Sequence, residues 1–189
     1  SLLESADKVA NTASVYGAFL KKIKKTAQKE LILEPAIFEI NSHSHEVYNE
    51  DSNLLIKKIK GDILYLDPPY NAREYGANYH LLNTIAKYDN FTPKGKTGLR
   101  DYSKSAFCKK KEVEKSFDDL IKNANFKYIF LSYNNEGIMS SETIKKILSN
   151  YGKYDLLTTE YQRFRADKKE NRNHKASSTT EYLHILEKL

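Results

Sequence analysis

The chain is poor in several residue types, and each shortage excludes a class of protein. It has a single cysteine, Cys108, so no internal disulfide can form, and a reducing cytoplasm is the expected compartment. Long apolar runs are missing, so we expect neither a transmembrane helix nor a membrane partner, and the N-terminus does not resemble a signal peptide. Met139 is the only methionine and the chain opens with SLLESADKV, from which we expect a piece of a longer protein.

The residues that are present are typical of a globular domain with a basic surface. The chain has 189 residues, of which 40% are hydrophobic, and this is enough for one domain with a core. Its 31 basic and 25 acidic residues give a formal charge of +6, and the basic residues cluster at 21–29, 94–111 and 163–175. Such clusters, interspersed with 14 tyrosines and 8 phenylalanines, favour nucleic acid as a partner. A solvated lysine-rich surface is the alternative for each cluster.

The first third of the chain predicts helices and short strands. Val9, Ala13, Tyr16 and Leu20 recur at helical spacing and predict a helix over 5–28. Short strands are expected at 36–40 and 46–50, and a helix at 51–61 with Asp51 or Ser52 as its N-cap. The apolar run at 63–66 predicts a strand that is buried on both faces.

The rest of the chain alternates helices with strands. Helices are expected at 77–88, 110–124 and 140–152, and strands at 127–133, 153–164 and 179–188. The alternation indicates an α/β class with a mostly parallel sheet. The last two strands have only a polar loop between them, so they should form an antiparallel hairpin.

The stretch GDILYLDPPYNAREYG, residues 61–76, joins a strand to a stiff turn. In an open α/β sheet, ligands bind beyond the carboxyl ends of the strands, and Asp67 stands at such an end. Pro68 and Pro69 fix their own φ angles and push Asp67 and Pro68 into extended conformations. Since neither proline has an N–H, the turn presents acceptors: the Asp67 carboxylate and the carbonyls of Asp67 and Pro68.

Two fixed acceptors, with the ring of Tyr70 just after them, suit a planar base that carries an exocyclic amino group. The amine hydrogens would meet the acceptors while the base stacks on Tyr70. Fixed acceptors also draw the amine lone pair out of ring conjugation, which makes a weak nucleophile reactive without a strong base. A base in a duplex must be extruded to reach such a pocket. A stiff turn with a capping aspartate is the alternative without a function.

The DPPY motif resembles motif IV of the amino-group DNA methyltransferases that use S-adenosylmethionine. The segments YLDPPYNAREYGANYHLLNTIA, YIFLSYNNEG and TTEYLHIL are similar to the adenine-specific class typified by the Dam and FokI-type enzymes, over roughly residues 47–188. The resemblance implies a partial Rossmann-like methyltransferase fold. It also implies methylation of the exocyclic amine of adenine in DNA, in a bacterial restriction–modification system.

The resemblance assigns roles around the DPPY motif. It implies that Asp67 and the Pro68 carbonyl bind the target amine, that Pro69 stiffens the turn, and that Tyr70 stacks on a flipped adenine. Methyl transfer would be a direct displacement, without a metal or a covalent enzyme intermediate, so that alignment does most of the work.

The resemblance also indicates where the cofactor binds. VYNEDSNLLI, residues 47–56, is similar to motif III, whose acidic residue binds the adenine part of S-adenosylmethionine. Asp51 is the candidate, with Ser52 beside it and Asp67 at the other end of the cofactor site. An ordinary helix N-cap is the competing interpretation of Asp51.

Contacts to double-stranded DNA are expected from residues that follow these motifs: Arg73, Tyr75, Tyr133, Arg163, Arg165 and Arg172. A surface ion pair is the alternative for Arg73, and a buried structural tyrosine is the alternative for Tyr133. The basic loop that holds the last three arginines also has a solvated loop as its competing interpretation. The five histidines form no metal set.

One family motif is missing. Motif I, of the form F-x-G-x-G, holds the methionine part of the cofactor, and none of the seven glycines makes this pattern. We therefore expect residues 1–34 to be a helical connecting or recognition segment and 35–189 to be the C-terminal part of a catalytic domain. The missing N-terminal segment of the same protein would be a partner of this chain, and a cognate restriction endonuclease would be another. Without that segment we expect neither tight cofactor binding nor catalysis.

Two alternative functions stay open at this point. One is methylation of another amino base, either cytosine in DNA or guanine in RNA. The other is a degenerate, non-catalytic relative that binds nucleic acid through its basic loops.

Overall fold

The computed structural model describes residues 1–11, 16, 21–162 and 178–189, and these fall into two compact units. The first unit combines Ser1–His45 with Arg73–Lys104, and the second combines Glu46–Ala72 with Ser105–Leu189. The predicted division at residue 34 stays a prediction. No helix within the described residues is both long enough and apolar enough to span a bilayer.

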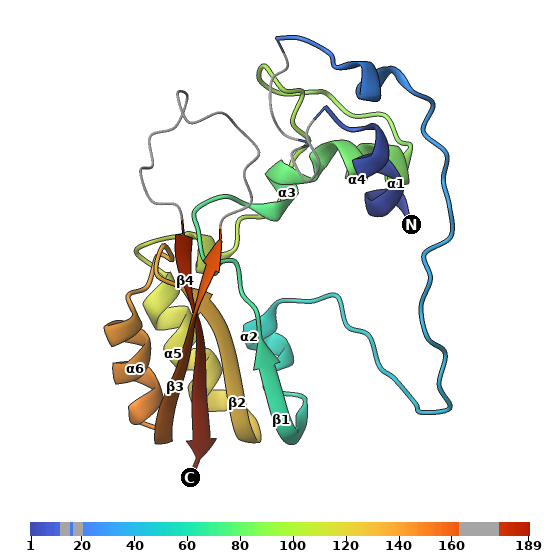
Figure 1. The fold of residues 1–189 in the computed structure, drawn as a ribbon. Coiled ribbons are helices and arrows are strands. Elements are labelled where there is room, and N and C mark those ends of the chain that lie inside the picture. The colour runs from blue at the N-terminus through green and yellow to red at the C-terminus, as the bar shows by residue number, and fades with distance from the viewer. Residues whose placement is uncertain (12–15, 17–20, 163–177) are drawn as a thin grey trace. The chain divides into compact units, whose positions relative to one another are not determined.

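The second unit is built on a four-stranded sheet with the strand order β1-β2-β4-β3 (Figure 1). The strands are β1 (Lys60–Leu66), β2 (Asn125–Asn134), β3 (Gly152–Gln162) and β4 (Ser178–Lys188). β1 pairs with β2 in parallel, whereas β4 is antiparallel to both β2 and β3. The α/β class and the terminal antiparallel hairpin are thereby confirmed.

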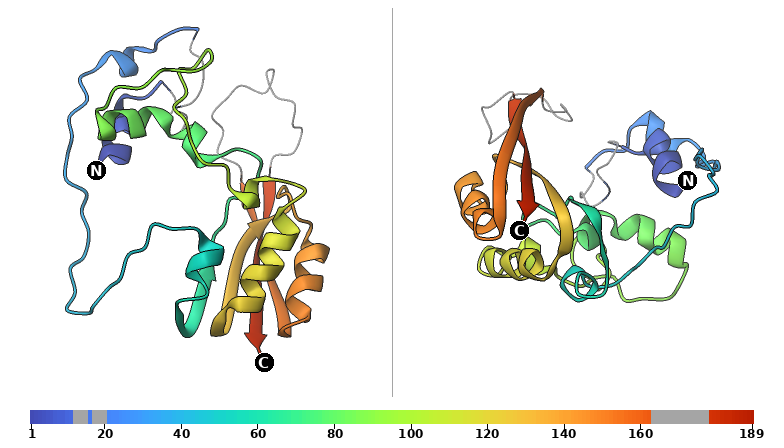
Figure 2. Two further views of the ribbon diagram at one scale, coloured as in Figure 1. Left: turned by 180° about the vertical axis from the view of Figure 1, so that it is seen from behind. Right: turned by 90° about the horizontal axis from the view of Figure 1, so that it is seen from below.

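Two amphipathic helices, α5 (Val113–Asn123) and α6 (Ser141–Ser149), lie on the same face of the sheet (Figure 2). Their buried apolar side chains meet the alternate residues of β2 and β4 that point to this face, and the core contains Phe117, Ile121, Ile144, Leu148, Ile129, Leu131 and Leu186. The predicted serine cap of α6 is confirmed, since the Ser140 hydroxyl accepts from the Thr143 N–H at 3.1 Å. A short helix, α2 (Ser52–Leu55), and a 3₁₀ turn, η2 (Ala106–Cys108), pack beside α5.

The opposite face of the sheet is exposed over β1. Leu64 and Leu66 point toward the core, but Ile63 and Tyr65 are 63% and 61% exposed. The predicted burial of this strand on both faces is therefore wrong. The reason is that both core helices lie on one face, and that β2 is the only described strand with which β1 pairs.

The first unit contains α1 (Leu2–Val9), η1 (Lys25–Gln28), α3 (Tyr75–Asn78) and α4 (His80–Lys87). The helix predicted at 77–88 corresponds to the end of α3 and to α4, with a break at Tyr79. His80 and Leu82 of α4 are buried, together with Ser5 and Ala6 of α1. Burial lowers the pKa of His80.

The continuous helix predicted over 5–28 is wrong. α1 ends at Val9, Ala10 is extended, and Lys25–Gln28 forms a 3₁₀ turn. Asn11 gives a physical reason, because its side chain accepts from the Lys24 N–H at 2.6 Å and donates to the Lys22 carbonyl at 3.1 Å. An asparagine that bonds the backbone in this way offers the chain an alternative to helix.

The strands predicted at 36–40 and 46–50 are also absent from the structure. Ile37, Phe38, Ile40 and Val47 are all highly exposed. A strand needs a partner for its backbone N–H and C=O groups, and no described strand pairs with either segment. The β-branched and aromatic residues of these segments were therefore not sufficient to predict a strand.

His184 on β4 is an imidazole enclosed by the core. It has no exposed surface, its Nδ1 is hydrogen-bonded to the Tyr154 hydroxyl at 2.9 Å, and its Nε2 has no hydrogen-bond partner in the described residues. The rings of Tyr154 and Tyr182 lie against it, with centroids at 6.0 and 5.7 Å. Burial lowers the pKa of His184 from 6.5 to about 4.

The stability of the fold should therefore decrease as the pH falls from about 6.5 to about 4. In this window the unfolded chain binds a proton at His184 and the folded chain does not, so protons favour unfolding. The full stability is present above 6.5, and roughly 3 kcal/mol is lost once the pH is below the folded pKa. Denaturant unfolding followed by circular dichroism at several pH values measures this loss.

His184→Leu is the matched control, because it retains every carboxylate that titrates in the same range. The variant should have a flatter dependence of unfolding free energy on pH than the wild type. Equal slopes for the two proteins would contradict the role of the imidazole.

Candidate active site

Asp67 follows the last residue of β1 and is exposed at the carboxyl end of that strand. Leu66 pairs with Leu131, so the residues after β1 and those after β2 leave the sheet at the same edge. Pro68 and Pro69 are half-buried, and Tyr70 is 36% exposed. The DPPY segment therefore presents one carboxylate and one ring to solvent at the sheet edge where α/β proteins bind ligands.

Tyr70 is held by the segment that follows β2. Its carbonyl accepts a hydrogen bond from the Ile138 N–H at 2.8 Å. Its ring meets the ring of Tyr133 edge to face, with centroids 6.2 Å apart and an interplanar angle of 77°. One aromatic contact thus connects the DPPY segment to β2, and one hydrogen bond connects it to the turn after β2.

Tyr133 is buried under this contact and is only 2% exposed. Its hydroxyl oxygen accepts from the Met139 N–H at 3.2 Å. Burial raises the pKa of Tyr133, so the hydroxyl stays protonated at neutral pH and cannot serve as a base. The predicted contact between Tyr133 and DNA is not tested by these observations and stays a prediction.

Asp51 is the N-cap of α2, which is one of the two roles that the sequence suggested for it. Its Oδ1 accepts from the backbone N–H groups of Asn53 at 2.9 Å and Leu54 at 3.2 Å. Its Oδ2 accepts no hydrogen bond from the described residues, and the side chain is exposed. Figure 1 shows α2 beside the arrowhead end of β1, the end that Asp67 follows. The cap and a ligand contact are thus compatible.

Asn53 fixes α2 against α5. Its side-chain amide donates to the Ser116 carbonyl at 2.9 Å and to Asp119 at 2.8 Å. The hydrogen bond from Asn53 lowers the pKa of Asp119. The sequence contains no short-range signal for this contact, because the partners are separated by more than 60 residues.

The other predicted DNA-binding residues belong to different parts of the chain. Arg73 and Tyr75 are exposed in the first unit, where the ring of Tyr75 stacks on Tyr79 with centroids 5.8 Å apart. Arg163, Arg165 and Arg172 lie outside the described residues.

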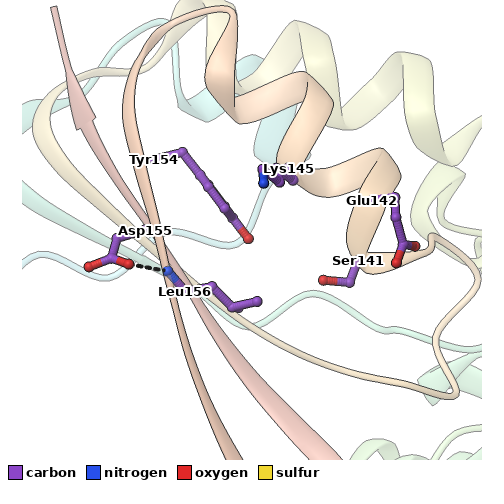
Figure 3. A pocket seen from close by; sticks show the side chains of 6 residues that line it. All are labelled: Ser141, Glu142, Lys145, Tyr154, Asp155 and Leu156. Carbon is purple, nitrogen blue, oxygen red and sulfur yellow. Dashed lines mark hydrogen bonds between the residues drawn. The ribbon is translucent and has the colours of Figure 1, made fainter.

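Two hollows of the described surface contain none of the predicted site residues. One, of about 460 Å³, lies between α6 and β3 and is lined by Tyr154, Lys145 and their neighbours (Figure 3). The Asp155 carboxylate at its rim accepts from the Leu156 N–H at 2.8 Å. The other, of about 430 Å³, is lined by Phe91, Arg100 and nearby loop residues of the first unit. In that hollow, Arg100 stacks on Phe91 and pairs with Asp89.

Comparison with known families shows the class of protein to which the chain belongs. The family model for D12 class N6 adenine-specific DNA methyltransferases matches residues 1–147. The chain belongs to this family. The resemblance inferred from DPPY is thereby confirmed, and with it the methyltransferase fold class.

Its relatives are type II methyltransferases. The chain is 70% identical over 188 residues to M.NlaIII of Neisseria lactamica, a match that covers 100% of the chain and 56% of that protein. It is 43% identical to M.FokI of Planomicrobium okeanokoites, covering 99% of the chain and 29% of that protein. M.CviAII of Paramecium bursaria Chlorella virus 1 is 45% identical over 88% of the chain and 50% of its own length.

The chain therefore spans about half of two of these relatives and less than a third of M.FokI. No solved structure matches the chain.

The cap at Asp51 gives a testable difference between two substitutions. Asp51→Ala should lower the free energy of unfolding by about 1 kcal/mol, because the Asn53 and Leu54 N–H groups lose their acceptor. Asp51→Asn keeps a side-chain oxygen at the same place and should change the stability by only a few tenths of a kcal/mol. Thermal or denaturant unfolding distinguishes the two, and equal losses would contradict the cap.

Proposed function

We propose that this chain is part of an enzyme that methylates the exocyclic amine of adenine in double-stranded DNA, within a bacterial restriction–modification system. The observation that carries the proposal is Asp67, exposed at the carboxyl end of β1 within a DPPY motif, in a chain of the D12 class. The type II methyltransferases among its relatives support the same activity. A cytoplasmic setting fits the single, buried Cys108.

In the proposed reaction the DPPY segment holds the amine of a flipped adenine. The Asp67 carboxylate and the Pro68 carbonyl accept hydrogen bonds from the two amine hydrogens, and Tyr70 stacks on the base. The backbone that carries both acceptors is restricted before the base arrives, because each proline fixes its own φ angle and keeps the residue before it extended. Preorganised acceptors stabilise the positive charge that develops on the amine nitrogen as it attacks. The exposed faces of Asp67 and Tyr70 leave room for the base.

The residues of this edge also fit S-adenosylmethionine. Oδ2 of Asp51 is a free acceptor for the adenine part of the cofactor, Ser52 lies beside it at the start of α2, and Asp67 stands at the same edge. When bound, the cofactor would supply an electrophilic methyl group on a sulfonium. The amine nitrogen would form the new N–C bond while the S–CH3 bond breaks, the sulfur would leave as a neutral thioether, and the amine would release one proton. Asn53 keeps this side of the site in place through its hydrogen bonds to α5.

DNA contacts are proposed for Arg73 and Tyr75, which are exposed, and for Arg163, Arg165 and Arg172. Arginines are suited to phosphate contacts, which fix the register of a protein on the duplex. A cognate restriction endonuclease would be the functional partner of the enzyme in the cell.

We further propose that an N-terminal segment of the same protein covers the open face of the sheet. Ile63 and Tyr65 expose apolar surface on that face, and β1 has a partner strand on one side only within the described residues. Parallel strands occur almost only in sheets that are covered on both faces. The length of the relatives is consistent with such a segment.

Asp67→Ala in the full-length protein should lower the methylation rate at least about 100-fold, because an acceptor that stabilises the developing charge is lost. The measurement is N6-methyladenine in unmethylated plasmid DNA, quantified by mass spectrometry of its nucleosides. Affinity for DNA should stay close to that of the wild type.

Asp62→Ala is the matched control, since Asp62 is an exposed aspartate on β1, the strand that Asp67 follows. It should retain the wild-type rate. A wild-type rate in Asp67→Ala would contradict the proposed role of Asp67. Product found solely on cytosine or on RNA would contradict the substrate, and full-length protein that binds no S-adenosylmethionine in calorimetry would contradict the enzyme.

Tyr65→Ser tests the proposed cover. In the full-length protein it should lower the free energy of unfolding by about 2 kcal/mol, because a buried ring is lost. In the 189-residue chain, where Tyr65 is 61% exposed, the effect should stay within about 0.5 kcal/mol.

Tyr161→Ser is the control for this experiment. Tyr161 is also 61% exposed but lies on β3, the strand at the opposite edge of the sheet from β1. Its substitution should have a small effect in both proteins. A small effect of Tyr65→Ser in the full-length protein would contradict the cover.

A further inference from the structure

We propose that Tyr133 and Gly137 are positioning residues that set the location of the Tyr70 ring, and that they act on the reaction through that ring. The inference rests on the proposed function, because it deepens the role of the target-base pocket. It assigns to Tyr133 a task that does not require it to touch DNA.

The turn after β2, which contacts Tyr70, is itself held by hydrogen bonds at its start. The Asn134 side chain accepts from the Glu136 N–H at 3.1 Å, which closes the turn after β2. Asn135 exchanges two hydrogen bonds with Thr180 of β4, from its N–H to the Thr180 carbonyl at 3.0 Å and from the Thr180 N–H to its side chain at 3.2 Å. The turn is therefore tied to the sheet before it reaches Tyr70.

Gly137 lies so close to the ring of Tyr133 that any side chain at position 137 would displace that ring. A Cβ at Gly137 would lie 2.0 Å from Cε1 and 2.6 Å from Cζ of Tyr133, a separation that non-bonded atoms do not adopt. The glycine thus provides the space in which the ring lies. The Met139 N–H then holds the far end of the ring through its hydroxyl at 3.2 Å.

This pair contacts Tyr70 in two ways. The ring of Tyr133 supports the Tyr70 ring at a centroid distance of 6.2 Å, and Ile138, the residue after Gly137, donates to the Tyr70 carbonyl at 2.8 Å. A displacement of Tyr133 or of the turn therefore moves both the backbone and the ring of Tyr70. Misplacement of about 1 Å in a group that aligns a substrate can cost about 100-fold in rate.

Burial favours this indirect role over a direct contact. Tyr133 is 2% exposed, whereas Tyr70 in front of it is 36% exposed. A base that arrives at the sheet edge meets Tyr70 first. Tyr133 lies beneath the Tyr70 ring and supports that ring.

The test is a double-mutant cycle in the full-length protein, with single-turnover methylation of plasmid DNA at saturating S-adenosylmethionine as the readout. Tyr133→Leu should lower the rate about tenfold and Tyr70→Leu about 100-fold. Because Tyr133 acts through Tyr70, the double variant should be no slower than Tyr70→Leu alone. Dissociation constants for S-adenosylmethionine should stay within about twofold of the wild type.

Two further variants keep the test informative if Tyr133→Leu folds poorly. Tyr133→Phe retains the supporting ring and should retain more of the rate than Tyr133→Leu. Gly137→Ala should slow the reaction like Tyr133→Leu, because its methyl group displaces the ring. Circular dichroism reports whether each variant is folded.

Tyr154→Leu is the matched control. Tyr154 is a half-buried tyrosine of the same sheet whose hydroxyl bonds His184, and it takes no part in the Tyr70 contacts described above. Any rate loss it causes should multiply with that of Tyr70→Leu. The inference would be overturned if the rate losses of Tyr133→Leu and Tyr70→Leu multiplied in the double variant. It would also be overturned if Tyr133→Phe were as slow as Tyr133→Leu. A wild-type protein that forms no N6-methyladenine would instead contradict the proposed function.

Discussion

The parallel pairing of β1 with β2, from Lys60–Asn125 to Leu66–Leu131, determines what can meet at the candidate site. Parallel strands point the same way, so the segments that follow them emerge at one edge of the sheet. The DPPY segment and the turn after β2 are separated by more than 60 residues in sequence, yet the Ile138 N–H reaches the Tyr70 carbonyl. An antiparallel pairing would have placed this turn at the opposite end of β1.

The same pairing depends on a core that is closed on one side. Leu64 and Leu66 of β1 continue the apolar layer of Ile129 and Leu131, which α5 and α6 cover. The opposite side of β1 exposes Ile63 and Tyr65. β1, which Asp67 follows, therefore makes apolar contacts on one face only, whereas a parallel strand in an α/β sheet normally makes them on both faces. The proposed cover of the sheet and the proposed role of Asp67 therefore depend on the same strand.

The sequence predicted the elements that local pattern or chemistry decides. Ser140 as the cap of α6, Asp51 as the cap of α2 and the terminal hairpin each follow from residues close together in the chain, and each is confirmed. The failures depend on distant partners. Residues 36–40 are rich in β-branched and aromatic side chains but pair with no described strand. The long helix is interrupted where the Asn11 side chain bonds the backbone. Of the site, DPPY was found from its motif, while the support by Gly137 and Ile138 depends on a register that no local pattern encodes.

The solvent exposure of Asp67 limits the strength of the hydrogen bonds that its carboxylate can make. A carboxylate in water attracts a partner only weakly, because solvent screens it, and its hydrogen bonds to an amine compete with water. Asp67 is exposed in this chain, so its electrostatic effect on a bound amine would be small until water is removed. In the proposed reaction, the base stacked on Tyr70, the cofactor and the N-terminal cover would each exclude water from this edge. We therefore expect activity to need all three together, since each raises the strength of the hydrogen bonds on which the others depend.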